Sequence, residues 1–186
     1  MNIDSTLIRL AKELVKLLNK TADENLPQEI ADVVKLHSKL AVGSAWIPLP
    51  GADLAAGAAS IWGMYARINS KLGIPFGENV IKSIGSGVAT NLVSYIAMAG
   101  LASAIKSIPG IGTFIGTVTA GVLLSASLYA VTMTSGWIYL KALCALAQKN
   151  GGNITGDDLS AAVDDVLQEK DAIKEFMNEA KSSYKK

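Results

Sequence analysis

The sequence predicts an all-α protein, a helical bundle with two helical hairpins. The second hairpin, at about residues 78–148, is very apolar, and amphipathic helices flank the bundle at both ends of the chain. Three observations support this prediction. Apolar residues recur at helical spacing near both ends of the chain. Turns containing proline and glycine, at 47–51 and 108–112, separate long stretches rich in Ala, Gly and Ser. Within residues 83–140, one residue of 58 is charged, namely Lys106.

The first 25 residues form an amphipathic segment. Leucines and an isoleucine recur three and four positions apart and predict a helix over about residues 4–20: Ile3, Leu7, Leu10, Leu14 and Leu17. Basic residues crowd the opposite side. Such a helix packs on a protein core, lies on anionic lipid, or pairs with a partner helix, and the sequence leaves these alternatives open. The interrupting charges predict that no cleaved signal peptide is present here.

Residues 26–149 are expected to form the helical core. Pro27 suits a first helical turn, and the pattern predicts helices over about 27–45 and 53–71. The proline-rich segment 46–51 ends the first of them. Asp53 then stands at a natural cap or first-turn position of the second helix. Between Lys39 and Arg67, Asp53 is the only charged residue.

The apolar hairpin begins near Glu78 and turns at 108–112, with Lys106 near its tip. A membrane-spanning helix needs about 20 apolar residues, and both arms reach that length. Ser and Thr recur through both arms, however, and such residues also suit a helix buried in protein, where their hydroxyls bond to backbone carbonyls. The sequence therefore allows a hairpin inserted in lipid or one sheltered inside a bundle.

The tail, residues 150–186, is helical and water-compatible. It holds eight of the sixteen acidic residues of the chain together with five basic ones. Thr155 and Asp158 stand three residues apart, as in a capping box. The tail is expected to form a small helix pair packed on the core, or a docking handle for a partner protein.

The chemistry-bearing residues do not form a catalytic pattern. His37 is the only histidine and Cys144 the only cysteine, so neither metal-ligand spacing nor a catalytic triad is evident. The glycines near residue 112 follow no strand and precede no Lys-Ser or Lys-Thr pair, unlike a phosphate loop. A net charge of +1 argues against nucleic-acid binding. We therefore expect no enzyme activity and no cofactor.

The candidate functional residues are those of the hairpin turns and of close helix packing. Gly112 and Gly116 are four positions apart, a spacing that lets two helices approach closely. The full set is Pro48, Pro50, Gly51, Asp53, Pro109, Gly110, Gly112 and Gly116.

Two motifs within residues 28–145 carry a family resemblance. Residues 47–56 read Ile-Pro-Leu-Pro-Gly-Ala-Asp-Leu-Ala-Ala, and residues 108–116 read Ile-Pro-Gly-Ile-Gly-Thr-Phe-Ile-Gly. In this order and spacing they resemble bacterial domain of unknown function family 697. The resemblance implies a helical, often membrane-associated domain, commonly fused to or encoded near Era-like GTPase domains. This chain contains no such domain, so a GTPase would act in trans.

These features predict a membrane-associated, non-enzymatic scaffold or accessory protein, able to form homo-oligomers and to work with a GTPase in trans. The protein would bind membrane lipid. It would lie at the bacterial inner membrane, with both termini in the cytoplasm. Two alternatives stay open. One is a colicin-like pore-forming or membrane-disrupting protein, whose soluble shell shelters the hairpin until it is released. The other is a soluble bundle that holds an apolar ligand such as a lipid between its helices.

Overall fold

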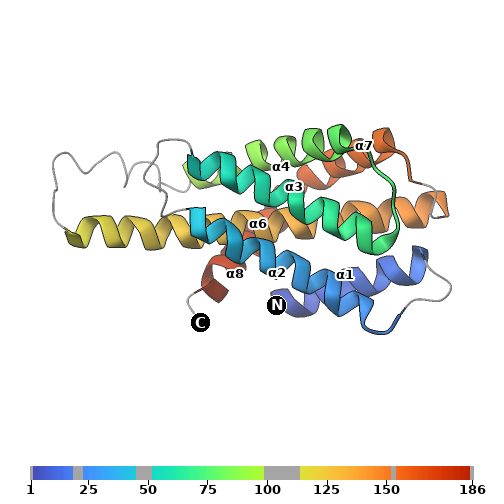
Figure 1. Ribbon diagram of the computed structural model, residues 1–186, viewed down its shortest axis with the longest axis horizontal. Helices are drawn as coiled ribbons and strands as arrows, with labels where there is room; N and C mark the ends of the chain where they lie inside the picture. Colours follow the sequence, from blue (N-terminus) through green and yellow to red (C-terminus); the bar gives the residue numbers. More distant parts are fainter. Residues whose placement is uncertain (1, 19–22, 45–51, 99–113, 152–153, 185–186) are drawn as a thin grey trace.

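The fold is all-α, as the sequence predicts. The computed structural model describes residues 2–18, 23–44, 52–98, 114–151 and 154–184, and these form seven α-helices without strands (Figure 1). The helices are α1 (Ile3–Leu18), α2 (Leu26–Ser44), α3 (Ala52–Leu72), α4 (Glu78–Met98), α6 (Phe114–Asn150), α7 (Gly156–Leu167) and α8 (Lys170–Tyr184).

The helix at the centre is α6, and every other helix packs against it. Figure 1 shows it running the whole length of the molecule, with the others arranged around it. From Ser125 to Leu140, fifteen of sixteen side chains are buried, and Tyr129 is half-buried. The second arm of the predicted hairpin is thus sheltered by protein over this stretch. It continues as one helix past Gly121.

Two small polar residues of α6, Thr134 and Ser135, have hydrogen-bond partners inside the bundle. Thr134 Oγ1 donates to the carbonyl of Ala130 at 2.7 Å, which satisfies its hydroxyl within its own helix. Ser135 lies beside Tyr65 of α3, whose hydroxyl is 3.1 Å from both the carbonyl oxygen and Oγ of Ser135. These bonds explain why a helix with so many hydroxyl groups is stable in a protein core.

Two tyrosines set how α3 lies along α6. Tyr65 and Tyr139 stack with ring centroids 3.9 Å apart and planes 9° apart. The hydroxyl of Tyr139 donates to Oδ1 of Asn69 at 2.9 Å. The pairs Tyr65–Ser135 and Asn69–Tyr139 are both separated by 70 positions in the sequence, so α3 and α6 run parallel with a constant offset.

The amphipathic ends of the chain close the bundle. The apolar face of α1 is buried, and Cys144 of α6 donates through Sγ to the carbonyl of Leu10 at 3.1 Å. In α8, Phe176 stacks on Trp137 with ring centroids 5.1 Å apart. The capping box that begins α7 is confirmed, because Thr155 Oγ1 accepts from the backbone N–H of Asp158 at 3.2 Å. The tail therefore forms the predicted helix pair.

Candidate functional site

Four helix ends meet at one end of the molecule, which we call the apolar end. They are the last residues of α2 and α4 and the first residues of α3 and α6, drawn at the left of Figure 1. Segment 45–51 joins the end of α2 to the start of α3, and segment 99–113 joins the end of α4 to the start of α6. Both predicted hairpin turns fall in these segments.

The first turns of α6 project beyond the rest of this end. With the 70-residue offset between α3 and α6, Ala52 at the start of α3 is level with Val122. The eight residues from Phe114 to Gly121 therefore extend past α3, which at 1.5 Å per residue is about 12 Å. The yellow part of α6 in Figure 1 shows this projection.

The projecting sequence and its surroundings are nearly free of charge. Between Leu40 and Ala66 the one charged residue is Asp53, and residues 83–140 contain Lys106 alone. These two stretches contain all four helix ends and both joining segments. Such runs of uncharged residues are typical of helices that meet lipid or that are buried in protein.

Charged residues gather toward the opposite end. The ion pair Lys71–Glu29 joins α3 to α2 there, and Lys141–Glu169 joins α6 to the turn between α7 and α8. Glu78 pairs with Lys82 one turn along α4. Exposed carboxylates also begin α7. These ion pairs thus lie away from the apolar end, whose four helix ends carry Asp53 as their one charged residue.

The predicted site residues are placed as follows. Pro48, Pro50, Gly51, Pro109, Gly110 and Gly112 lie outside the described residues, so their role in the turns stays a prediction. Asp53 lies in the first turn of α3 and Gly116 in the first turn of α6. The structure thus brings the helix starts that carry these two residues to the same end, although they are 63 positions apart in the sequence.

Within the part of the chain that the structure describes, one helical stretch, Ser125–Asn150, is long and apolar enough to cross a bilayer. Of its most apolar window, 89% is buried inside the bundle. The core helix of a soluble protein has the same length and composition, so this stretch is weak support for a membrane span.

His37, the histidine of the chain, is buried between α2 and α3. Its Cε1 atom is 3.0 Å from where a Cβ would stand on Gly63, so the ring fills the space that this glycine leaves. Ser60 Oγ donates to the carbonyl of His37 at 2.8 Å. Burial, with a further contribution from the Arg67 charge, holds the pKa of His37 below its usual range.

Nothing around His37 forms a metal site. Among the described residues, no three His, Cys, Asp or Glu side chains lie close enough to hold a metal ion. At the centre of the bundle, the hydroxyl of Tyr65 bonds to Ser135 of α6, and the hydroxyl of Tyr139 bonds to Oδ1 of Asn69. Their arrangement holds helices together.

Comparison with known proteins gives one distant relationship. The chain is a distant homologue of "Magnetosome membrane protein 22" of Magnetospirillum gryphiswaldense, with 32% identity over 124 residues. The match covers 66% of this chain and 59% of that protein, so this chain spans well under two thirds of the relative's length. No family model matches the chain. No solved structure matches it either.

Proposed function

We propose that this protein is a membrane-associated, non-enzymatic helical scaffold or accessory protein that enters lipid with its apolar end. The observation that carries the proposal is the separation of charge along the long axis. The uncharged stretches 40–52 and 83–105 converge on one end, and α6 projects from that end. The charged end would remain in water.

The dimensions of the projection suit one leaflet. The hydrocarbon core of a bilayer is about 30 Å thick, so each leaflet contributes about 15 Å. The projecting turns of α6 are about 12 Å long. Entry by this end would therefore leave the buried stretch of α6 covered by its neighbours, and the bundle would not need to open.

The relationship to a protein whose name describes it as a magnetosome membrane protein supports membrane association. The two motifs that resemble family 697 are the basis for proposing a GTPase partner in trans, although no family model matches the chain. Lys82 and Lys141, at the two open ends of the predicted hairpin, favour the bacterial inner membrane with both termini cytoplasmic. Homo-oligomers would form through the small residues of the projecting part of α6, beginning with Gly116, because small side chains let helices approach closely in lipid.

Flotation with liposomes tests the mode of membrane binding. Val118→Lys adds a charge in the projecting turns, and Leu36→Lys adds the same charge on the flank of α2, where Leu36 is 44% exposed. A charge within the hydrocarbon costs about 2.5–3.5 kcal/mol at the bilayer centre and less near its surface. We therefore expect Val118→Lys to weaken partitioning at least tenfold and Leu36→Lys to leave it unchanged.

Three outcomes would contradict the proposal. Failure of the unaltered protein to float with vesicles would remove membrane association. A loss with Leu36→Lys but not with Val118→Lys would move the contact to the flank of α2. Release of an entrapped dye on binding would favour the pore-forming alternative, because it requires α6 to leave its shelter.

The scaffold role has its own test. Purified protein in vesicles should give cross-linked homo-oligomers, and Gly116→Leu should reduce them by blocking close helix approach. A strictly monomeric pattern in vesicles would refute oligomerisation and leave membrane binding standing.

A further inference from the structure

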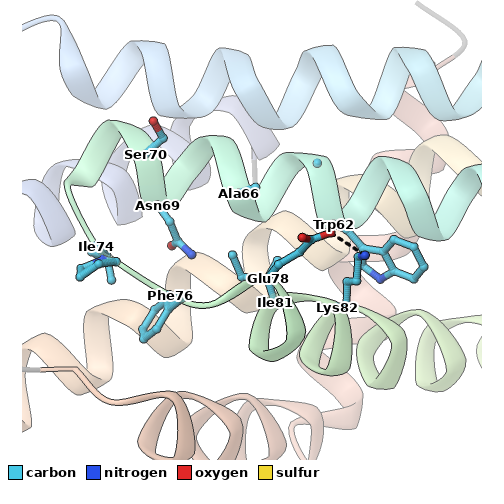
Figure 2. Close-up of a pocket in the computed structure, with 11 residues that line it drawn as sticks. Trp62, Ala66, Asn69, Ser70, Ile74, Phe76, Glu78, Ile81 and Lys82 are labelled. Carbon is cyan, nitrogen blue, oxygen red and sulfur yellow. Dashed lines mark ion pairs between the residues drawn. The ribbon is translucent and has the colours of Figure 1, made fainter.

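A groove between α3 and α4, far from the apolar end, carries a second inference. Its volume is about 490 Å³, within the range of pockets that hold one small molecule. Trp62 and Asn69 of α3 stand toward its two ends, and the loop joining α3 to α4 contributes Phe76 (Figure 2). The 70-residue offset places Asn69 level with Tyr139, deep in the charged half of the molecule.

The groove exists because α3 presents small side chains there. Ala66 and Ser70 are four positions apart on α3, and both line the groove. Gly63 also lines it, although the space that a Cβ would take at Gly63 is filled by the ring of His37. The loop that follows begins with Gly73, whose φ of 66° turns the chain away from α3. Apolar side chains of Ile74, Phe76 and Ile81 form much of the remaining wall.

Two buried donors of residues that line this groove, Asn69 Nδ2 and Trp62 Nε1, have no hydrogen-bond partner within the described residues. Asn69 is 3% exposed, and its Oδ1 accepts from the hydroxyl of Tyr139. In this orientation of the Asn69 amide, the hydroxyl proton of Tyr139 has an acceptor. The amide donor Nδ2 has no hydrogen bond within the described residues. Figure 2 shows the amide directed toward the space between Phe76 and Glu78. An unpaired buried donor among apolar side chains fits a ligand that brings an acceptor oxygen on an apolar body.

The other end of the groove is amphipathic and exposed. Lys82 pairs with Glu78, and its Nζ lies 6.0 Å from the centre of the Trp62 ring. Because Lys82 and Glu78 neutralise each other, this end does not select a strongly charged ligand. The separation of Asn69 and Trp62, seven residues along α3, corresponds to about 10 Å of groove.

We propose that this groove binds one medium-chain acyl amphiphile, such as a fatty acid or its ester. Its carbonyl oxygen accepts from Asn69 Nδ2, and its chain lies over Ala66 and Gly63 toward Trp62. A single acyl chain matches the volume and the length of the groove, its apolar wall and the neutral, unpaired donor of Asn69. This site is distinct from the apolar end and does not depend on membrane entry.

The test uses 11-(dansylamino)undecanoic acid as a fluorescent probe, below its micelle concentration and without vesicles. We expect saturable binding at one probe per chain, accompanied by energy transfer from tryptophan. Decanoate should displace the probe, whereas decylammonium, which has the same chain but no carbonyl, should displace it at least tenfold less well. Equal displacement by both would refute recognition through Asn69.

Variants locate the site. Ala66→Phe fills the groove from an exposed helix position and should weaken binding more than tenfold, while Ala59→Phe, on the same helix outside the groove, should not. Asn69→Asp keeps an acceptor for Tyr139 but removes the donor, and should also weaken decanoate binding. Circular dichroism would verify that each variant is folded.

The remaining outcomes overturn the proposal. If the unaltered chain shows no saturable binding, the groove does not bind acyl amphiphiles. Unchanged binding by Ala66→Phe would place the probe elsewhere. A loss of binding with Val118→Lys, with binding retained in Ala66→Phe, would assign the probe to the apolar end instead.

Discussion

Replacement of Gly136 by alanine tests how closely α2 must approach α6. A Cβ added at Gly136 would stand 2.6 Å from Cγ1 and 2.9 Å from Cγ2 of Val34, and 3.3 Å from Sδ of Met64. All three distances are below ordinary van der Waals contact. Val34 is fully buried and β-branched, so its side chain has few rotamers with which to move aside.

Two opposing effects decide the size of the change. Overpacking a well-packed core costs about 1–3 kcal/mol. Alanine is favoured over glycine within a helix by about 1 kcal/mol, which offsets part of this cost. We expect Gly136→Ala to lower the free energy of unfolding by about 0.5–2 kcal/mol. Gly87→Ala is the matched control, since nothing lies within 4 Å of its added Cβ on the exposed face of α4, and it should stabilise by about 0.5–1 kcal/mol.

Urea unfolding followed by circular dichroism at 222 nm measures both variants. In the double variant Val34→Ala/Gly136→Ala, the second change should cost less than it does alone, because the clash has been removed. If the Gly136→Ala protein is as stable as the Gly87→Ala protein, the close approach of α2 and α6 is refuted. An unchanged slope of free energy against urea would verify that the unfolded states are comparable.

Three further predictions concern buried side chains. Tyr139→Phe should lower the free energy of unfolding by about 1–3 kcal/mol, measured in urea, because the Oδ1 atom of Asn69 loses its donor. Burial, with the charge of Glu13, raises the pKa of the Cys144 thiol to about 12, so iodoacetamide at pH 8 should label it only after unfolding; rapid labelling of the folded chain would contradict its burial. The lowered pKa of His37 means that, as pH falls below about 6.5, the unfolded chain binds protons before the folded one does, and stability decreases. The melting temperature of His37→Gln should fall less between pH 7 and pH 5 than that of the unaltered protein.

Much of the secondary structure could be predicted from local sequence. Proline and glycine stop helices for steric reasons that act within a few residues, so the ends of α2 and the start of α3 lie within one residue of the predicted positions. The same holds for the capping box at Thr155, whose two partners are three residues apart. The amphipathic face of α1 is buried as its pattern predicts.

The placement of these helices could not be predicted, because it depends on residues far apart in the chain. The groove between α3 and α4 needs the small side chains of one helix and the loop that follows it, and its unpaired donor is defined by Tyr139, 70 positions from Asn69. No periodicity in the sequence of α3 distinguishes Ala66 in this groove from Ala59 outside it.

By itself, the sequence determined that the chain is helical, where its helices begin and end, and that its central third is nearly uncharged. Lipid and a protein interior both favour uncharged helices, so composition could not separate an inserted hairpin from a sheltered one. Tertiary structure decided that point for Ser125–Leu140, where six other helices cover α6. It also decided that the first turns of α6 extend past α3, since the relative positions of two helices are set by side chains that meet only after folding.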